Sequence, residues 1–323
     1  MSGAFDSVLL IAFGGPTSLE EVRPFLANVT RGRPIPPARL DIVAHHYELI
    51  GGRSPLNDLT FRQADALAAE LHAHGSALPT FVGMRNWHPF LHETLAEMAA
   101  RGHRRAIGLI LSPQQNEAGW DRYQQDVITA QTAVGARAPE VVYAPPWADH
   151  PLFIAAVAEQ TATALARLTT SERSATHVIF TAHSVPVAMA NASPYVAQIE
   201  SGARAVAGRL GLADWSVAYQ SRSGNPRDPW LEPDVGDALK ALAGRGVRSC
   251  VVTPIGFVCD HVEVLYDLDI EARAVAEGLG IRFERASTVN DHPIFIRMLA
   301  ELVRTTATRA GGTSSPRLAG ASR

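Results

Sequence analysis

Short apolar runs that end at glycine or proline recur along the first half of the chain. Runs of this kind, rich in Val, Ile and Leu, are typical of strands buried on both faces. Between them lie longer segments, rich in Ala and Leu, whose composition favours helices. We predict strands at 8–13, 80–84, 106–111 and 141–143, and helices at 20–28, 60–74, 91–100 and 123–134.

The same alternation restarts near His150 and continues almost to the end of the chain. The segment 195–210 is amphipathic, because its apolar residues return on one face of a helix. We predict strands at 177–181, 215–219, 249–253 and 281–285, and helices at 150–168, 195–210, 234–243 and 294–303. Strands that alternate with helices are typical of an α/β fold with mainly parallel sheets.

Two pairs of similar segments indicate an internal duplication. RGHRR and RGVRS each join a predicted helix to a predicted strand, and their glycines, Gly102 and Gly246, are 246 − 102 = 144 residues apart. His150 and His292 each open a His-Pro helix start, 292 − 150 = 142 residues apart. Proline suits the first helical turn anyway, so coincidence is the alternative. We predict two α/β lobes with a ligand cleft between them. Their ranges are 1–148 and 149–310, followed by a Gly/Ser-rich disordered tail, 311–323.

The composition narrows the class of protein. The 323 residues are 46% hydrophobic and 19% charged, as in globular proteins, and the net charge of −3 gives no reason to expect nucleic-acid binding. The N-terminus lacks the basic region of a signal peptide, and no apolar run reaches the ~18 residues of a membrane span. Two cysteines, Cys250 and Cys259, favour neither a disulfide framework nor a zinc site. We expect a cytoplasmic monomer.

A run of acidic residues follows the predicted strand at 249–253. Glu263, Asp267 and Glu271 are spaced i, i+4, i+8, which places three carboxylates on one stripe of an α-helix. Such like charges repel, so a cation is expected to offset them. The stripe is either a solvated acidic face or a binding site for a divalent cation with oxygen ligands. His261, two residues before Glu263, is predicted to point away from it and to be structural.

A histidine also stands at the end of a predicted strand. His183 follows the apolar run VIFTA and is either an inert, hydrogen-bonded residue or a general base that accepts a proton near pH 7. The loop with Arg31 and Arg33 is either solvated or an anion clamp. His45 and His46 are adjacent and cannot share a face. Gly14-Gly15 belongs to no GxGxxG or P-loop motif, which argues against a nucleotide site.

Taken together, several segments resemble one family, ferrochelatase. They are LLIAFGGP, VRPFLANVTRGRPIP, HHYELIGGRSPLN, VGMRNWHPF, FTAHSVP, AYQSRSGNPRDPWLEPD and PIGFVCDHVEVLYDLDIEA, and they extend from about residue 7 to 303. The resemblance implies two Rossmann-like domains, each a parallel four-stranded sheet flanked by helices, with a porphyrin in the cleft. It also implies insertion of Fe²⁺ into the porphyrin, with release of two protons and no nucleotide cofactor.

The resemblance also assigns roles to residues. His183 and Glu263 match the catalytic pair that faces the porphyrin centre from opposite sides and handles metal or pyrrole protons. Asp267 and Glu271 match an acidic ridge that leads outward, so the four residues together are the expected metal-handling set. Phe13, Arg31, Ser54 and Tyr123 match positions that contact the macrocycle or its propionates.

The chain departs from some relatives in ways that change the expectations. Relatives with a [2Fe–2S] cluster hold it on four cysteines, and with two we expect no cluster and no other cofactor. The segment LSPQQNEAGWDRY and the position of Glu48 differ from better-known versions. FGGP, NVTRGR and MRNWHP resemble most the bacterial members that act on coproporphyrin III, so the resemblance favours this substrate over protoporphyrin IX. The alternatives are a cobalt or nickel chelatase of the same fold, and a porphyrin- or haem-binding protein without catalysis.

Overall fold

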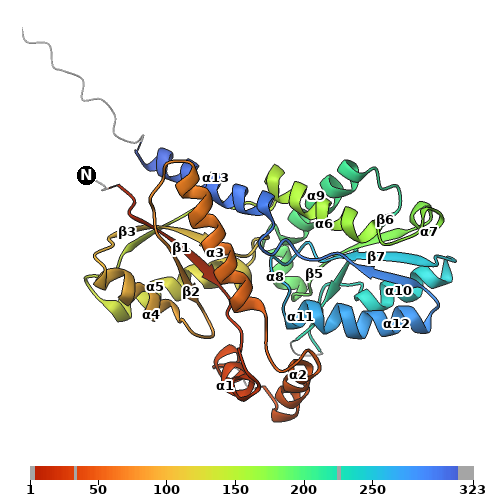
Figure 1. Cartoon of the computed structure of the whole chain (residues 1–323). Helices are drawn as coiled ribbons and strands as arrows, with labels where there is room; N and C mark the ends of the chain where they lie inside the picture. Colours follow the sequence, from red (N-terminus) through yellow and green to blue (C-terminus); the bar gives the residue numbers. More distant parts are fainter. Residues whose placement is uncertain (1–3, 33–34, 224–226, 312–323) are drawn as a thin grey trace, which may run out of the picture.

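A computed structural model describes residues 4–32, 35–223 and 227–311 and divides into two lobes that lie side by side (Figure 1). Each lobe contains a four-stranded, fully parallel sheet with helices on its faces. The α/β fold class predicted from the sequence is therefore confirmed. The central strands carry little polar surface: Val8 to Ile11 and Val178 to Phe180 are fully buried, as expected for parallel strands covered on both sides.

The first lobe has the strand order β2-β1-β3-β4. Its strands are β1 (Ser7–Ala12), β2 (Thr80–Met84), β3 (Arg105–Ile110) and β4 (Glu140–Tyr143). Helices α3 (Leu56–Ala73), α4 (Leu91–Ala100) and α5 (Arg122–Val134) flank the sheet, and α1 (Leu19–Val29) and α2 (Pro37–Leu49) project below it (Figure 1). A single π-helical turn, η1 (Glu117–Asp121), precedes α5.

The second lobe repeats this order as β6-β5-β7-β8. Its strands are β5 (His177–His183), β6 (Trp215–Gln220), β7 (Ser249–Thr253) and β8 (Arg282–Arg285). Its helices are α6 (Pro151–Leu165), α7 (Thr170–Ser174), α8 (Val187–Asn191), α9 (Tyr195–Leu210), α10 (Val235–Gly244), α11 (Val262–Leu265), α12 (Arg273–Gly278) and α13 (Pro293–Gly311), with a π-helix, η2 (Asp267–Ala272), before α12.

Two equivalent features relate the lobes in detail. The N–H of Met84, at the outer edge of β2, donates to the carbonyl of Pro89, and the N–H of Tyr219 in β6 donates in the same way to Pro233. The residue after each proline, Phe90 or Asp234, forms a parallel bridge with the same strand end. Each of these residues is also the N-cap of the helix that follows, α4 or α10. The strand order and these matching connections support the duplication inferred from the sequence.

Helices α6 and α13 join the lobes. They pack against each other, and α13 crosses from the second lobe to pack on α3 of the first (Figure 1). The predicted range 149–310 for the second lobe therefore includes a helix that contacts both lobes. The predicted tail begins one residue early, because Gly311 still belongs to α13, and the rest of it lies outside the described residues. None of the described helices combines the length and apolar character that crossing a membrane would require.

Candidate active site

His183 is the last residue of the central strand β5, at the carboxyl end of the second sheet. Its Nδ1–H donates to the carbonyl of Ser184, which directs Nε2 away from the backbone. Nε2 lies 3.4 Å from Oε1 of Glu263, and the two side chains are 27% and 36% exposed. The sequence placed these residues 80 positions apart at two strand ends, and the fold brings them together.

Glu263 also contacts a second imidazole, that of His261. Its other oxygen, Oε2, lies 3.3 Å from Nε2 of His261, whose Nδ1 contacts the carbonyl of Cys259. The prediction that His261 points away from Glu263 is therefore wrong. The predicted helix would have started near Asp260, but His261 is extended (φ −146°, ψ −174°) and α11 begins after it. In extended backbone, side chains two residues apart project to the same side.

The charges of this group reinforce one another. Burial alone would lower the pKa of His183, but the Glu263 carboxylate and the Ser184 carbonyl raise it above its ordinary value. Burial alone would raise the pKa of Glu263, but His183 and His261 hold it well below its ordinary value. Both shifts favour an imidazolium–carboxylate pair.

The acidic residues beyond Glu263 lie on a π-helix. The N–H of Glu271 donates to the carbonyl of Tyr266, five residues earlier, so the predicted regular α-helix is wrong here. The three carboxylates of Glu263, Asp267 and Glu271 still lie near one another, because the charges of the two glutamates both act on Asp267. Asp267 accepts a hydrogen bond from the Ser221 hydroxyl. Burial, followed by the charges of Glu263 and Glu271, raises the pKa of Asp267 to about 7. Partial desolvation and the charge of Asp234 also raise the pKa of Glu271, whose side chain reaches the surface.

This arrangement does not form a closed metal cage. Among the described residues, no group of three or more His, Cys, Asp or Glu side chains is arranged so that it could hold a metal ion. His183, Glu263, Asp267 and Glu271 instead form an open series that runs from the sheet edge to the surface. The predicted metal-handling set stays a prediction.

The four predicted substrate contacts all belong to the first lobe. Phe13 follows β1, is 37% exposed and packs edge-to-face on Phe25. Arg31 is exposed, and its guanidinium donates to the side-chain oxygen of Asn28. Tyr123 is buried, with the Arg85 guanidinium 4.4 Å from its ring centroid. The same guanidinium lies 6.0 Å from the Phe13 ring, so Phe13 and Tyr123 flank one cation. Arg33 lies outside the described residues.

Ser54, the fourth predicted contact, is buried against the glycine turn after β1. A Cβ atom on Gly15 would lie 2.8 Å from Cβ of Ser54, so this close approach requires glycine. The carbonyl of Pro16 accepts from the N–H of Ser54, and the side chain of Asn57 accepts from the N–H of Gly15. The two segments AFGGP and GGRSPLN, distant in sequence, thus form one wall of the first lobe.

Sequence reasoning missed several residues around His183 and Glu263. Gln220 lies beside His183 in the sheet, and its side-chain amide donates to the carbonyl of Glu263. His46 of α2 stacks on Tyr266 with ring centroids 3.6 Å apart, which connects the two lobes. Gln220 could have been found from its position, because it ends the strand next to His183. No pattern in the sequence pairs His46 with Tyr266.

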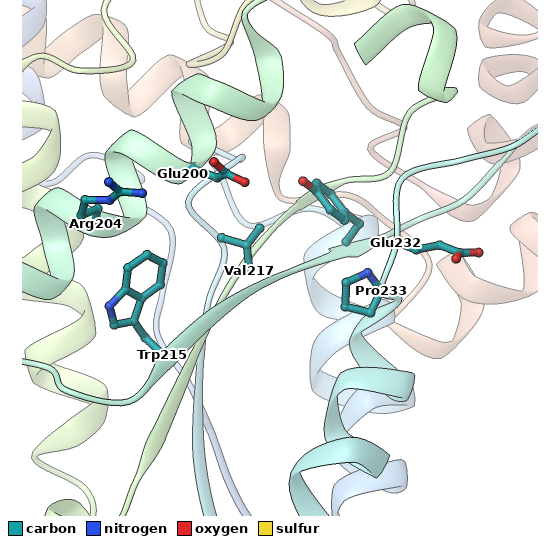
Figure 2. Close-up of a pocket in the computed structure, with 7 residues that line it drawn as sticks. Glu200, Arg204, Trp215, Val217, Glu232 and Pro233 are labelled. Carbon is teal, nitrogen blue, oxygen red and sulfur yellow. The ribbon is translucent and has the colours of Figure 1, made fainter. Parts of the chain in front are cut away.

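A separate cavity of about 410 Å³ lies outside this site (Figure 2). Figure 2 shows Glu200 and Arg204 on α9 above Trp215 and Val217 of β6, with Pro233 beside them. None of the predicted site residues lines it. Because β6 is the outer strand of its sheet, the cavity marks the flank of the second lobe and not the cleft.

The fold resembles that of chelatases. A solved structure of SirB from Bacillus subtilis with Fe³⁺ aligns with a TM-score of 0.59 at 11% identity, covering 96% of this chain and 98% of that one. Another, of the sirohydrochlorin chelatase SirB from Bacillus subtilis subspecies spizizenii with cobalt, aligns with a TM-score of 0.56 at 11% identity, covering the same shares. At this identity the likeness concerns the fold alone.

Sequence comparison identifies the family. The Ferrochelatase family profile matches residues 6–307. The chain is 44% identical over 303 residues to the coproporphyrin III ferrochelatase of Mycolicibacterium smegmatis, covering 93% of this chain and 89% of the relative. It is 46% identical over 309 residues to the same-named protein of Nocardia farcinica, covering 93% and 88%. The chain belongs to the ferrochelatase family, and the family predicted from the sequence is confirmed.

Proposed function

We propose that this protein inserts Fe²⁺ into coproporphyrin III as a step of haem biosynthesis. The observation that carries the proposal is the His183–Glu263 pair at the carboxyl end of β5, in a chain 44–46% identical to relatives named for this activity. Iron is a substrate here, not a resident cofactor. A cytoplasmic, monomeric protein remains part of the proposal.

Metal insertion needs two events at the porphyrin centre. The ring nitrogens must lose two protons, and the ring must bend so that their lone pairs face the incoming ion. Binding energy from the ring edges can supply the bend. We place those edge contacts in the first lobe, at Phe13, Ser54 and Tyr123. The imidazole of His183 and the carboxylates beside it then remove protons and supply iron.

The short distance between His183 and Glu263 has a mechanistic consequence. Contacting heavy atoms lie about 3.5–4.0 Å apart, so a ring held between an imidazole and a carboxylate needs about 7 Å between them. His183 and Glu263 both belong to the second lobe and are 3.4 Å apart. We therefore place both on one face of the porphyrin, and not on opposite faces as the resemblance implied. In its neutral form, the imidazole accepts a pyrrole proton at Nε2, because Nδ1–H donates to the carbonyl of Ser184.

The cysteines offer no alternative chemistry. Cys250 and Cys259 are free and buried, and burial raises the pKa of each thiol to about 12. Neutral thiols are poor metal ligands and nucleophiles. A [2Fe–2S] cluster requires about four thiolates, which this sequence cannot supply. We therefore route no step through a cluster.

The choice of porphyrin rests on charge. Coproporphyrin III carries four propionates and protoporphyrin IX carries two. Additional cations at the cleft therefore favour the binding of coproporphyrin III. Arg31 and Arg39 are exposed on the α1–α2 side of the first lobe. Arg39 also donates to the carbonyl of Arg222 in the second lobe, which places it where the lobes meet. Arginine is suited to carboxylates by its fork geometry.

Anaerobic turnover without ATP tests the proposal. Purified protein, Fe²⁺ and either free-base porphyrin are mixed, and metallation is followed by the Soret shift and the collapse of four Q bands to two. We expect acceleration over the protein-free blank, with a higher kcat/KM for coproporphyrin III. A faster reaction with protoporphyrin IX would reverse the substrate assignment. Porphyrin binding without acceleration would indicate a carrier protein, and activity confined to cobalt or nickel would indicate another chelatase.

A further inference from the structure

One largely buried cation joins two carboxylates on either side of Glu263. Arg285, the last residue of β8, is 12% exposed. Its Nε and Nη2 donate to the two oxygens of Asp269 at 2.8 and 2.7 Å, and its Nη1 donates to Oδ1 of Asp260 at 2.9 Å. Asp260 precedes the catalytic segment, and Asp269 lies within η2. One guanidinium therefore spans the segment from before Glu263 to beyond it.

Asp260 is itself fixed from other directions. Its Oδ1 accepts from the N–H of Thr288, and its Oδ2 accepts from the side chain of Asn290, both at 3.2 Å. The carbonyl of Asn290 accepts from the side chain of Gln63 at 2.7 Å, and Gln63 belongs to α3 of the first lobe. The network thus continues from the catalytic segment into the opposite lobe.

Asp269 ties down the π-helix. It lies between Asp267 and Glu271, two residues from each, and it pairs with Arg285 behind the segment while those residues belong to the acidic series. A π-helix is an irregular element with weak intrinsic preference, so its shape depends on such tertiary contacts. Arginine is suited to the task, because its planar fork makes two parallel bonds to Asp269 and still reaches Asp260.

We propose that Arg285 is a positioning residue that sets the distances from Glu263 and Asp267 to the porphyrin centre, and so controls iron delivery. This inference rests on the proposed function. It assigns no contact between Arg285 and substrate. In the first lobe the equivalent strand, β4, ends in Tyr143, where no such cation exists. The equivalent π-helical turn there, η1, carries none of the predicted metal-handling residues. The difference between the two strand ends supports a role for Arg285 in the lobe to which we assign iron handling.

The test uses R285K and D269N. Lysine keeps the charge but cannot make the fork, and asparagine keeps the shape but loses the charge. We expect each to lower kcat/KM for Fe²⁺ about 10- to 100-fold, as loss of a residue that orients metal ligands typically does. The dissociation constant for coproporphyrin III, from fluorescence quenching, should stay within about twofold. The double variant should lose no more than the worse single variant, because both changes break one contact.

R105K is the matched control. Arg105 starts β3 in the first lobe, is 13% exposed and lies 3.1 Å from Glu140, so it is also a largely buried arginine in an ion pair. It should lower the melting temperature without changing kcat/KM for Fe²⁺. Wild-type activity in R285K and D269N would overturn the proposal. A loss of kcat/KM for Fe²⁺ that is matched by an equal loss of porphyrin affinity would also overturn it. The same holds if the losses of the two single variants multiply in the double variant. If R285K does not fold, D269N decides, and an inactive wild-type protein would reject the proposed function instead.

Discussion

The two lobes share one architecture but present different chemistry at the carboxyl ends of their strands. Both have the edge-to-edge order 2-1-3-4 of their own strands, and both hold a π-helical turn after the third strand. The first lobe ends its central strand with Ala12-Phe13 and a glycine turn against Ser54. The second ends its central strand with His183 facing Glu263. The two lobes repeat one scaffold, and we propose that the side chains at equivalent strand ends have different roles.

This difference teaches that the fold alone does not define the reaction. We assign binding of the macrocycle to the aromatic and glycine-containing surfaces of the first lobe. We assign proton transfer and metal handling to the second lobe. If the division is correct, variants in the second lobe should change kcat, and variants in the first should change porphyrin affinity. Features that are the same in both lobes should affect stability alone.

The largest effect is expected from H183A. Removing the base should lower kcat about 10²- to 10⁴-fold, the usual contribution of a positioned acid–base group. Porphyrin affinity, measured by fluorescence quenching, should change little, because the grip belongs to the first lobe. H103A is the control, since His103 lies 3.5 Å from Asp6 in the first lobe and has no predicted role in the chemistry. Full turnover in H183A would remove the assigned base.

E263Q should have the second largest effect. Loss of the carboxylate should lower kcat about 10- to 100-fold, as for other residues at a metal site. It should also lower the pKa of His183 in the ligand-free protein, because burial remains while the charge that raises this pKa is gone. NMR titration of the His183 ring measures the shift. An unchanged His183 pKa would mean that the two groups do not interact in solution.

The comparison of wild type with E263Q also tests how pH changes the stability of the fold. The raised pKa of His183 stabilises the fold below its unfolded value of about 6.5, and the effect is lost as pH rises through the folded pKa. The lowered pKa of Glu263 stabilises the fold above about 4.3, and the effect is lost as pH falls through the folded pKa. The stability difference between wild type and E263Q, from urea unfolding, should therefore be largest between about pH 4.3 and 6.5. A difference that is constant with pH would contradict the ion pair.

The sequence predicted the fold more fully than the site. The eight strands were predictable because buried parallel strands read as near-continuous apolar runs. The short helices α7 and α8, of five residues each, were missed because such a length shows no helical periodicity. The meeting of His183 and Glu263 followed from a general rule, since parallel strands place their carboxyl ends on one edge.

The errors at the site have a common cause, which is irregular backbone. The predicted α-helical stripe assumed regular geometry through Glu263, Asp267 and Glu271, but η2 replaces it, and no simple residue pattern marks a π-helix. His261 was misplaced for the same reason, because it precedes α11 in extended backbone. Contacts such as His46 on Tyr266 depend on how the lobes dock, which local patterns do not encode.

A smaller effect is expected from F13A in the first lobe. Phe13 is partly exposed and packs on Phe25, so its ring is available to the macrocycle. We expect KM for coproporphyrin III to rise about tenfold, equivalent to about 1.4 kcal/mol, with kcat nearly unchanged. F61A is the control, because Phe61 is an exposed aromatic residue on α3 that belongs to neither the catalytic pair nor the predicted substrate contacts. A loss confined to kcat would contradict the division between lobes.

The smallest effect is expected where the lobes are most alike. His150 and His292 each accept the N–H two residues later, at the starts of α6 and α13. Each also faces a glutamate of the other helix, at 3.9 Å from Glu301 and 3.4 Å from Glu159. H150A and H292A should each cost about 1 kcal/mol, the typical value of a helix cap, because partly exposed ion pairs add little. Urea unfolding should give similar losses for both, with kcat unchanged. A loss of activity in only one of the two variants would mean that the contacts between α6 and α13 affect the chemistry of one lobe. It would contradict the expectation that features shared by both lobes affect stability alone.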